Sequence, residues 1–484
     1  MLRPWKTLFN ISFHTDHTLV RQISEVIRNE IIRGRLESGA SLPGSRALAQ
    51  DIGVNRKTVV FAYEALIAEG WLESRHKSGT FIAKNLPLIA ETSKPVLKRI
   101  VSNFNYIQHD SFDLNDRPLD GNLIVFNEGG PDTRLAPLRE LSMAYKRVFQ
   151  RQGKWRLLGY GSEKGDLKLR EMIAVMLARD RGLHADVADI CITRGSQMAI
   201  YLAAKVLVHP GDVVVVENPG YYAARKLFHE AGAVLKTVDV DKDGINVDAL
   251  EELCLQTKIK AVYVTPHHQF PTTVMMKAGR RIKLIELSLK YHFAVIEDDY
   301  DHEYHFGAGN NLALASNYKA ANVIYISSLS KLIAPAIRMG YITGPAAFMK
   351  SLVNLRVQID RQGDAIMEHA IAELMEDGTM ARHARKVVAV YKERRDLMEA
   401  CLLQNFGDQV SFRKPEGGLA CWVKFNREMN FPQYMELLKL RGVQVVPPGS
   451  FYLNNQPSDY IRLGYGSLNK EELTEGLKVM SCTL

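Results

Sequence analysis

Four short apolar runs, separated by stretches with helical periodicity, constrain the fold of this chain more than any other feature. The runs are DVVVVE (212–217), IKAVYVTP (259–266), HFAVIEDD (292–299) and NVIYISS (322–328). Runs of this length without polar alternation are typical of parallel strands that are buried on both faces. Their alternation with helical patterns predicts an α/β fold, in which helices cover both faces of a mainly parallel sheet.

Polar loops follow these four runs, and they contain NPGYY, PHHQFP, DDYDHEY and SLSK. Because ligands on parallel sheets bind beyond the carboxyl ends of the strands, the loops predict a binding site. Lys331 follows the last run, with several serines before it and Arg338 after it. A lysine that forms a Schiff base must be neutral part of the time, which a partly desolvated, electropositive site favours. Hydroxyls and an arginine at this range suit a phosphate group.

Two further features fit the same kind of site. TRGSQMAIYLAAK (193–205) begins a helix at Gly195, and the free backbone N–H groups of its first turn could hold a phosphate. Asp298 ends a strand, where a carboxylate could keep a pyridine nitrogen protonated and so strengthen pyridoxal 5′-phosphate (PLP) as an electron sink. Each feature alone has an ordinary explanation, such as a solvated lysine or a simple helix start. Their shared position at strand ends favours a cofactor site.

The adjacent histidines His267 and His268 could suggest a metal ion, but no partner ligand is spaced for one. We therefore interpret them as turn residues and expect no metal. The five cysteines also lack metal-ligand spacing, and they favour a reduced, cytoplasmic setting. No secretory signal or membrane span is expected, because the N-terminus has no apolar core and no apolar run is long enough.

The first eighty residues have a different organisation. TLVRQISEVIRNEIIRG predicts an amphipathic helix that ends near Gly34, and LPGSRALAQDIGVNRKTVVFAYEALIAEGWL predicts two short helices hinged at Gly53. Asn55 is the expected N-cap of the last helix. WLESRHKSGTFIA then reads as two short strands around a turn. The apolar side of the last helix should bury Val59, Tyr63, Leu66 and Ile67.

This N-terminal part is modestly basic. Residues 1–84 contain twelve Lys/Arg and eight Asp/Glu, so they hold +4 of the formal net charge of +8. The first turn of the last helix presents Arg56, Lys57 and Thr58 outward, which is what a helix that enters the major groove of DNA requires. A small helical domain with a solvated charged face is the plainer alternative.

The order of helix, helix-turn-helix and hairpin resembles the winged helix-turn-helix of GntR-type bacterial regulators. The resemblance rests on LPGSRALAQDIGVNRKTV, AYEALIAEGWLESR and SGTF. It implies double-stranded DNA as a partner. It also places a set of residues at the bases or phosphates: Arg46, Arg56, Lys57, Thr58, Arg75 and Lys77. Family members usually have serine at Gly44 and Asn55, and asparagine at Lys57.

The larger part resembles the fold-type I aminotransferases, through YGSEKGDLKLREMIAVMLARDRGL, TRGSQMAI, ENPGYYAAR, TPHHQFPT, EDDYDHEY, SLSKLIAPAIRMGY, PPGSFY and IRLGYG. Both parts together resemble the MocR-type PLP-dependent transcription regulators. The resemblance implies a smaller C-terminal α/β subdomain, and PLP as the cofactor. Lys331 would form the Schiff base with PLP, and Asp298 would pair with the pyridine nitrogen. Tyr300 would bond the 3-hydroxyl of PLP, and Tyr221 would stack on its ring.

The same resemblance assigns the remaining site residues. The cofactor phosphate would be held by Ser196, Gln197, Ser328 and Arg338. Tyr160 would reach the phosphate of the neighbouring subunit's cofactor, which implies a homodimer with a head-to-tail arrangement. Arg462 matches the arginine that binds the α-carboxylate of an amino acid. The chain departs from the family at three positions: Thr273 replaces a glycine, His302 replaces a serine, and His305 stands where arginine is common.

We therefore expect a winged helix-turn-helix domain at 12–84, a linker at 85–121 and an aminotransferase-like domain at 122–484. The leading hypothesis is a DNA-binding regulator that senses PLP or an amino compound. A working aminotransferase with an accessory DNA-binding domain is the first alternative, because every residue for amine exchange is present. A binding protein with a degenerate cofactor site is the second, and the intact Lys331, Asp298 and Arg338 weigh against it.

Overall fold

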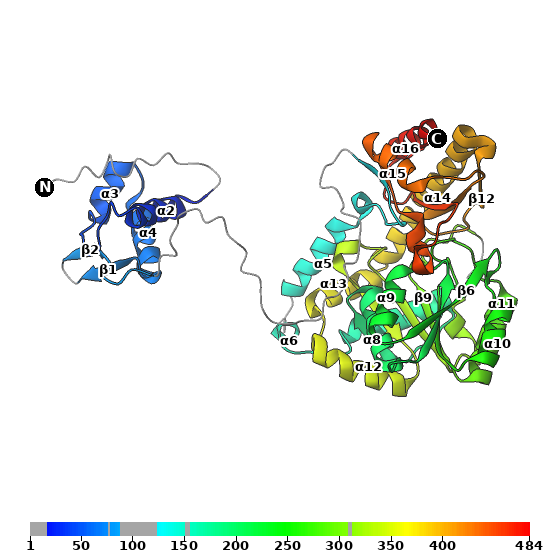
Figure 1. Cartoon of the computed structure of the whole chain (residues 1–484). Coiled ribbons are helices and arrows are strands. Elements are labelled where there is room, and N and C mark those ends of the chain that lie inside the picture. The colour runs from blue at the N-terminus through cyan, green and yellow to red at the C-terminus, as the bar shows by residue number, and fades with distance from the viewer. Residues whose placement is uncertain (1–16, 76–77, 88–122, 151–154, 308–311) are drawn as a thin grey trace. The chain divides into compact units, whose positions relative to one another are not determined.

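The computed structural model of the chain describes residues 17–75, 78–87, 123–150, 155–307 and 312–484. The chain divides into two compact units, Met1–Asp110 and Ser111–Leu484. Figure 1 shows both units, and each is described below by itself.

The first unit has the expected order of helix, helix-turn-helix and hairpin. Its elements in the described residues are α2 (Leu19–Ile32), α3 (Ser45–Ile52), α4 (Arg56–Ala68), β1 (Leu72–Arg75) and β2 (Gly79–Ile82). The turn between α3 and α4 contains Gly53 in the left-handed conformation, with φ of 71°. Asn55 caps α4 as predicted, because its side-chain oxygen accepts a hydrogen bond from the backbone N–H of Lys57 at 2.9 Å.

The core of this unit lies between α2, α3, α4 and the hairpin. Val59, Tyr63 and Leu66 of α4 are buried, which confirms the prediction for these three residues. The prediction for Ile67 was wrong, since 36% of its surface is exposed. One residue beyond Leu66 is about 100° further around the helix, which turns Ile67 away from the core.

The hairpin that follows α4 is the predicted wing. β1 and β2 pair in antiparallel fashion, with Leu72 opposite Ile82 and Arg75 opposite Gly79. Residues 76–77 at its tip, and therefore Lys77, lie outside the described residues. Most of the expected linker, 85–121, also lies outside them.

The four apolar runs form four neighbouring strands of an eight-stranded sheet in the second unit. They are β5 (Val213–Asn218), β8 (Ile259–Val264), β9 (Ala294–Asp299) and β10 (Val323–Ser328). These strands lie in the order β10-β9-β8-β5 and pair in parallel, as predicted. The parallel sheet continues at one edge through β6 (Val234–Asp241), followed by the short β7 (Gly244–Ile245). At the other edge, β11 (Gly340–Thr343) runs antiparallel between β10 and β4 (Ile190–Thr193).

Helices cover both faces of this sheet because successive residues of its strands point in opposite directions. Val214 and Val216 of β5 pack with α8 (Gly195–Leu207), α9 (Tyr222–Glu230) and α12 (Ala346–Ile359). Val215 points to the other face, where it shares a core with α10 (Val247–Gln256) and α11 (Ala278–Tyr291) (Figure 1).

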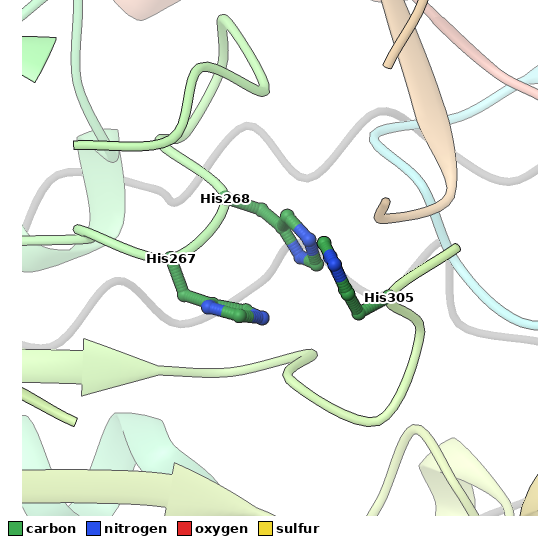
Figure 2. A group of neighbouring side chains, drawn as sticks. All are labelled: His267, His268 and His305. Atoms are coloured by element: carbon green, nitrogen blue, oxygen red, sulfur yellow. The ribbon is translucent and has the colours of Figure 1, made fainter. Parts of the chain in front are cut away.

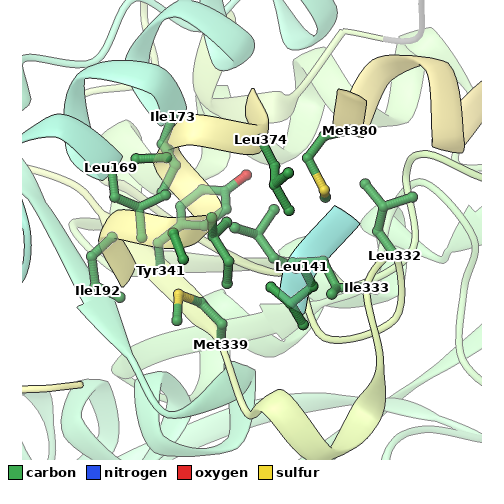
Figure 3. Packing of buried hydrophobic residues seen from close by; sticks show 14 of the residues in the cluster. Leu141, Leu169, Ile173, Ile192, Leu332, Ile333, Met339, Tyr341, Leu374 and Met380 are labelled. Carbon is green, nitrogen blue, oxygen red and sulfur yellow. The ribbon is translucent and has the colours of Figure 1, made fainter. Parts of the chain in front are cut away.

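A third core holds the segment that follows β10. Three of its helices are α5 (Leu138–Gln150), α7 (Leu167–Met176) and α13 (Ala365–Glu376), which supply Leu141, Leu169 and Leu374. Figure 3 shows these side chains gathered with Leu332 and Ile333, which follow Lys331 directly in the chain. Buried neighbours on its C-terminal side therefore fix the backbone at Lys331.

The smaller C-terminal α/β subdomain has its own core. β12 (Val410–Phe412), β13 (Ala420–Phe425) and β15 (Tyr460–Gly464) form an antiparallel sheet, and β14 (Val443–Val445) pairs in parallel with β3 (Ile124–Phe126). The helices of this subdomain are α14 (Thr379–Phe406), α15 (Phe431–Leu440) and α16 (Lys470–Thr483). Phe126 is buried in this core, so β3 packs among the last elements of the chain. In the described part of the chain, no helix has both the length and the apolar character to cross a membrane.

Candidate functional site

A cavity of about 390 Å³ lies beyond the carboxyl ends of β5, β8, β9 and β10. This is the edge where the sequence predicts a ligand site. The structure brings most of the predicted cofactor residues to its wall: Ser196, Gln197, Tyr221, Asp298, Tyr300, Ser328, Lys331 and Arg338.

Lys331 lies on the wall of the cavity, after the end of β10. Its Nζ donates a hydrogen bond to the main-chain oxygen of Gly129 at 3.2 Å and lies 4.3 Å from the centre of the Tyr300 ring. Burial lowers the pKa of Lys331 from its usual value, against the opposing charge of Asp301. A lowered pKa increases the fraction of neutral amine, the form that reacts with an aldehyde.

Asp298 provides the clearest test of whether the cavity fits PLP. It is 3% exposed, and one carboxylate oxygen accepts a hydrogen bond from the Tyr263 hydroxyl at 2.6 Å. The other oxygen, Oδ1, has no hydrogen-bond partner among the described residues. Burial raises the pKa of Asp298 to about 7. A buried carboxylate oxygen without a donor fits a protonated ring nitrogen, which supplies both a donor and the opposite charge.

The predicted phosphate-binding residues surround the start of α8. Ser196 and Gln197 lie in the first turn of this helix, where backbone N–H groups have no partner within the helix. Arg338 adopts a left-handed conformation with φ of 51°, and its Nη2 donates to the main-chain oxygen of Arg194 at 3.4 Å. A Cβ at Gly195 would lie 2.7 Å from this Nη2, so glycine permits the close approach of Arg338.

The two predicted tyrosines lie on the wall of the cavity with different partners. The Tyr221 ring meets the Phe270 ring edge to face, with ring centres 5.1 Å apart. The Tyr300 hydroxyl donates to the main-chain oxygen of His268 at 2.9 Å. Burial raises the pKa of both phenols, so both remain neutral donors at physiological pH.

Two predicted residues do not line the cavity within this chain. Tyr160 is 80% exposed, and the Arg361 guanidinium lies over its ring at 4.1 Å. Arg462 is 1% exposed, donates to the main-chain oxygen of Glu128 at 2.9 Å and also bonds the main-chain oxygen of Pro271. Arg462 therefore lies behind the cavity wall, and Tyr160 lies on the surface.

Sequence reasoning missed two buried groups at this site. Tyr263 bonds Asp298 from the neighbouring strand, and its signal is a hydroxyl within the largely apolar run IKAVYV. Glu217 is the next-to-last residue of β5. It accepts hydrogen bonds from the backbone N–H and the hydroxyl of Thr265, at 3.1 and 2.7 Å, and from Gln269 at 3.2 Å. Burial raises the pKa of Glu217 to about 7. This carboxyl group holds the 265–270 loop beside the cavity.

Most of the predicted DNA-binding residues in the first unit lie at the starts of two helices. Arg46 in α3 and Arg56 and Lys57 in α4 are exposed, and Thr58 is half-buried. Arg75 on the wing is more constrained. It pairs with Glu73 at 2.6 Å, and its guanidinium lies 4.3 Å from the centre of the Phe81 ring.

The geometry of the second unit agrees with a comparison of the chain to known protein families. A family described as aminotransferase class I and II matches residues 122–480. The chain belongs to this family. Its C-terminal domain therefore has the fold-type I architecture, and PLP is its cofactor.

Solved structures support this assignment of the family. The chain is 28% identical to a kynurenine aminotransferase from Pyrococcus horikoshii, with a TM-score of 0.71 over 75% of this chain and 91% of that one. It is 30% identical to an archaeal alanine:glyoxylate aminotransferase, again with a TM-score of 0.71, over 74% of this chain and 90% of that one.

The N-terminal part matches a second family, described as bacterial regulatory proteins, gntR family, over residues 19–82. Two relatives span both parts. The chain is 28% identical to the probable rhizopine catabolism regulatory protein MocR of Rhizobium meliloti, over 96% of this chain and 93% of that protein. It is also 28% identical to the HTH-type transcriptional regulator TauR of Rhodobacter capsulatus, over 95% of each. The chain thus has the organisation of the MocR-type transcription regulators, with a DNA-binding domain joined to a PLP-binding domain.

Proposed function

We propose that the chain regulates transcription through changes in DNA binding when its C-terminal domain binds PLP and an amino compound. This proposal rests on two features of one chain. The predicted cofactor residues line a cavity, and exposed cations lie at the starts of α3 and α4. Bound PLP supplies an aldehyde for exchange between amines and an electron-accepting ring. The protein would meet both DNA and PLP in the cytoplasm.

The roles of the cavity residues follow from their positions. Lys331 would bind the aldehyde carbon through Nζ, and Asp298 would hold the ring nitrogen. Ser196, Gln197 and Arg338 would hold the phosphate. Ser328, which also lines the cavity, would add a hydroxyl, and Tyr221 and Tyr300 would contact the ring and its 3-hydroxyl.

The effector would be an amino compound with an anionic group. Arg462 supports this, since it is a buried guanidinium only one residue layer behind the cavity, against Glu128 and Pro271. A carboxylate that reaches it would replace main-chain oxygens by a charged partner, which binds a guanidinium more strongly. The amino group of the same compound would compete with Lys331 for the aldehyde.

A head-to-tail homodimer would complete the site with Tyr160. The surface near Tyr160 supports this, because Trp155 and Leu158 on the same segment are 68% and 63% exposed. Exposed apolar side chains that lie together mark protein interfaces. The domain boundaries that we propose remain 12–84, 85–121 and 122–484, and the matched ranges 19–82 and 122–480 support them.

Some of the DNA-binding residues would contact bases, and others would contact phosphates. Arg46, Arg56 and Thr58 would reach the DNA from the starts of α3 and α4, with Lys57 at a phosphate. Arg75 and Lys77 would follow the backbone of the DNA from the wing.

The experiment compares the affinity of the full-length protein for DNA upstream of its own gene, with and without PLP and candidate amines. The wild type should change its affinity at least about fivefold between the loaded and unloaded states, a typical coupling between two sites. Lys331→Ala should bind DNA without this change. Equal affinity of the wild type in both states would contradict the proposal.

The same preparations test the alternative of a working aminotransferase. Transamination at about 1 s⁻¹ or faster, unchanged when residues 1–84 are removed, would favour the enzyme. The regulator predicts DNA binding that weakens steeply with salt and disappears with the same deletion.

A further inference from the structure

Three histidine side chains meet outside the cofactor cavity, on loops that follow adjacent strands. His267 and His268 follow β8, and His305 lies shortly after β9. One ring nitrogen of each lies within 4.8 Å of a ring nitrogen of the other two. Figure 2 shows the three rings gathered between the two loops. The spacing along the sequence could not reveal this group, because the fold brings His305 to the adjacent pair.

Ring nitrogens of His267 and His268 are buried without hydrogen-bond partners among the described residues. His267 is 2% exposed, and neither of its ring nitrogens has a hydrogen-bond partner among the described residues. His268 is also 2% exposed, and its Nε2 has no partner there either. Buried polar atoms are nearly always satisfied, so nitrogens without a partner on two adjacent rings indicate a ligand that would bind one nitrogen of each ring.

Asp301 orients one of these rings. The Nδ1 of His268 lies 2.8 Å from a carboxylate oxygen of Asp301. With the proton on Nδ1, the lone pair of Nε2 is free to bind a ligand. A carboxylate that fixes a histidine in this way is the usual second layer of a metal site.

The backbone of residue 417 packs close to the same nitrogen. A Cβ at position 417 would lie 2.1 Å from the Nε2 of His268, and the residue there is Gly417. Glycine therefore permits the close approach of the His268 ring to this segment. The cluster contains buried ring nitrogens and one ring that a carboxylate orients.

We propose that His267, His268 and His305 bind a divalent transition-metal ion, with Zn²⁺ as the best candidate. Three neutral imidazoles without a thiolate suit zinc, copper or nickel, whereas calcium and magnesium require oxygen ligands. Three protein ligands leave the fourth position of a tetrahedral ion to water or another ligand.

The three ring nitrogens would have to move closer together to bind one zinc ion. Zinc–nitrogen bonds of about 2.0–2.1 Å place tetrahedral ligand nitrogens roughly 3.4 Å apart. The ring nitrogens at up to 4.8 Å would therefore approach one another by an ångström or more. His305 is the least buried of the three and sits on the loop that leads to Gly307, so its ring is the one best able to move.

The charges around the cluster accommodate a cation. Asp299 and Asp301 both lie near it, and Asp299 is paired with Arg181 at 2.7 Å. Asp301 contacts His268 of the cluster and has no arginine partner among the described ion pairs. The main-chain oxygen of His268 accepts the Tyr300 hydroxyl, so an ion here would also stiffen the loop that contacts the cofactor cavity.

The test measures zinc binding by the full-length protein, prepared without a histidine tag and treated with a chelator. Equilibrium dialysis against Zn²⁺ alone should give one ion per chain. His267→Ala and His305→Ala should each weaken binding at least about tenfold, since even the loss of a supporting partner costs 10–100-fold. Replacement of zinc by Co²⁺ should give the visible absorption of a tetrahedral site with imidazole ligands.

Two matched variants serve as controls. His302→Ala removes a buried neighbour on the same loop, and His209→Ala removes a histidine whose side chain is 81% exposed. Both should bind zinc within twofold of the wild type. The proposal is overturned if the wild type binds no stoichiometric ion, or if His305→Ala binds as the wild type does. A loss with His302→Ala but not with His305→Ala overturns the choice of ligands.

Circular dichroism and PLP absorbance show whether each variant is folded. If neither ligand variant folds, the Co²⁺ spectrum of the wild type decides. Tetrahedral bands support the site, and their absence at one equivalent of Co²⁺ overturns it.

Discussion

The two domains of this chain differ in how far their functional charged side chains are exposed. In the DNA-binding domain, Arg46, Arg56 and Lys57 are exposed at the starts of helices. In the PLP-binding domain, Asp298 and Arg462 are 3% and 1% exposed, and each is held by groups of its own chain. Exposed cations suit a long polyanion that is met from solution, whereas buried charges suit one small ligand with matching partners. Single changes should therefore have larger effects in the second domain.

The two domains also differ in the residues that adopt positive φ angles. In the described part of the DNA-binding domain, positive φ angles occur at glycines such as Gly53. In the PLP-binding domain they also occur at Thr273 and Arg338, next to the loop and the helix start that form the cavity. Strained residues of this kind persist where the surrounding structure holds them, often at binding sites.

The largest expected effect is the loss of covalent cofactor binding in Lys331→Ala. Among the described residues that line the cavity, no other side chain carries an amine, so the yellow absorbance after incubation with PLP should disappear. Borohydride treatment of the wild type should fix the cofactor to the protein, and the variant should release it. Lys242→Ala, at an exposed lysine, should behave as the wild type. Retained colour in Lys331→Ala would refute the assignment of this lysine.

A second prediction concerns the pH dependence of stability. Burial raises the pKa of Glu217 from its ordinary value of 4.5 to about 7. Between these values the folded protein keeps a proton that the unfolded chain has released. The stability that the protonated group provides is therefore present below pH 4.5 and is lost as the pH rises to 7. Glu217→Gln, which resembles the protonated form, should gain about 3 kcal/mol over the wild type across this range.

Urea denaturation of the PLP-free protein at several pH values, followed by circular dichroism, measures this difference. The exposed Glu475→Gln is the matched control and should show no such gain. A constant difference between wild type and Glu217→Gln from pH 4.5 to 7.5 would show that the carboxyl group titrates normally.

Smaller effects are expected at the exposed cations of the DNA-binding domain. Arg56→Ala should weaken specific DNA binding by about 1–3 kcal/mol, the usual contribution of an arginine at a base. Lys57→Ala should weaken binding to all sequences and lower the slope against salt by about one unit. Fluorescence anisotropy at several salt concentrations measures both. Arg21→Ala, at an exposed arginine paired with Glu25 on α2, should have no effect.

The smallest effect is expected at Thr273, where φ is 62°. A left-handed conformation costs a β-branched residue about 1–2 kcal/mol, so Thr273→Gly should stabilise the PLP-binding domain by about 1 kcal/mol. Thr272→Gly, at a neighbour without a positive φ whose hydroxyl donates to Gln269 at 2.6 Å, should destabilise it. Thermal unfolding measures the melting temperatures of both variants. A lower melting temperature for Thr273→Gly than for the wild type would show that Thr273 is not strained.

The sequence was sufficient for features that depend on local pattern. Four apolar runs identified β5, β8, β9 and β10, and the position of Asp298 at the end of one run and of Lys331 after another identified the cavity. The capping role of Asn55 was also visible, because a cap depends on residues a few positions away.

Features that depend on distant parts of the chain were not visible. The hydroxyl of Tyr263 meets Asp298 only because β8 and β9 are neighbours, and His305 meets His267 only after both loops fold. Ile67 was misjudged because its apolar character says nothing of its direction on the helix.

The exposed position of Tyr160 has a consequence for how the regulator would behave in a cell. In the proposed dimer, each subunit lends this hydroxyl to the cofactor of the other, so assembly and cofactor retention strengthen each other by mass action. At a low concentration of the protein, the dimer and the bound cofactor would be lost together. The amount of the regulator in the cell would then itself become a signal to which it responds.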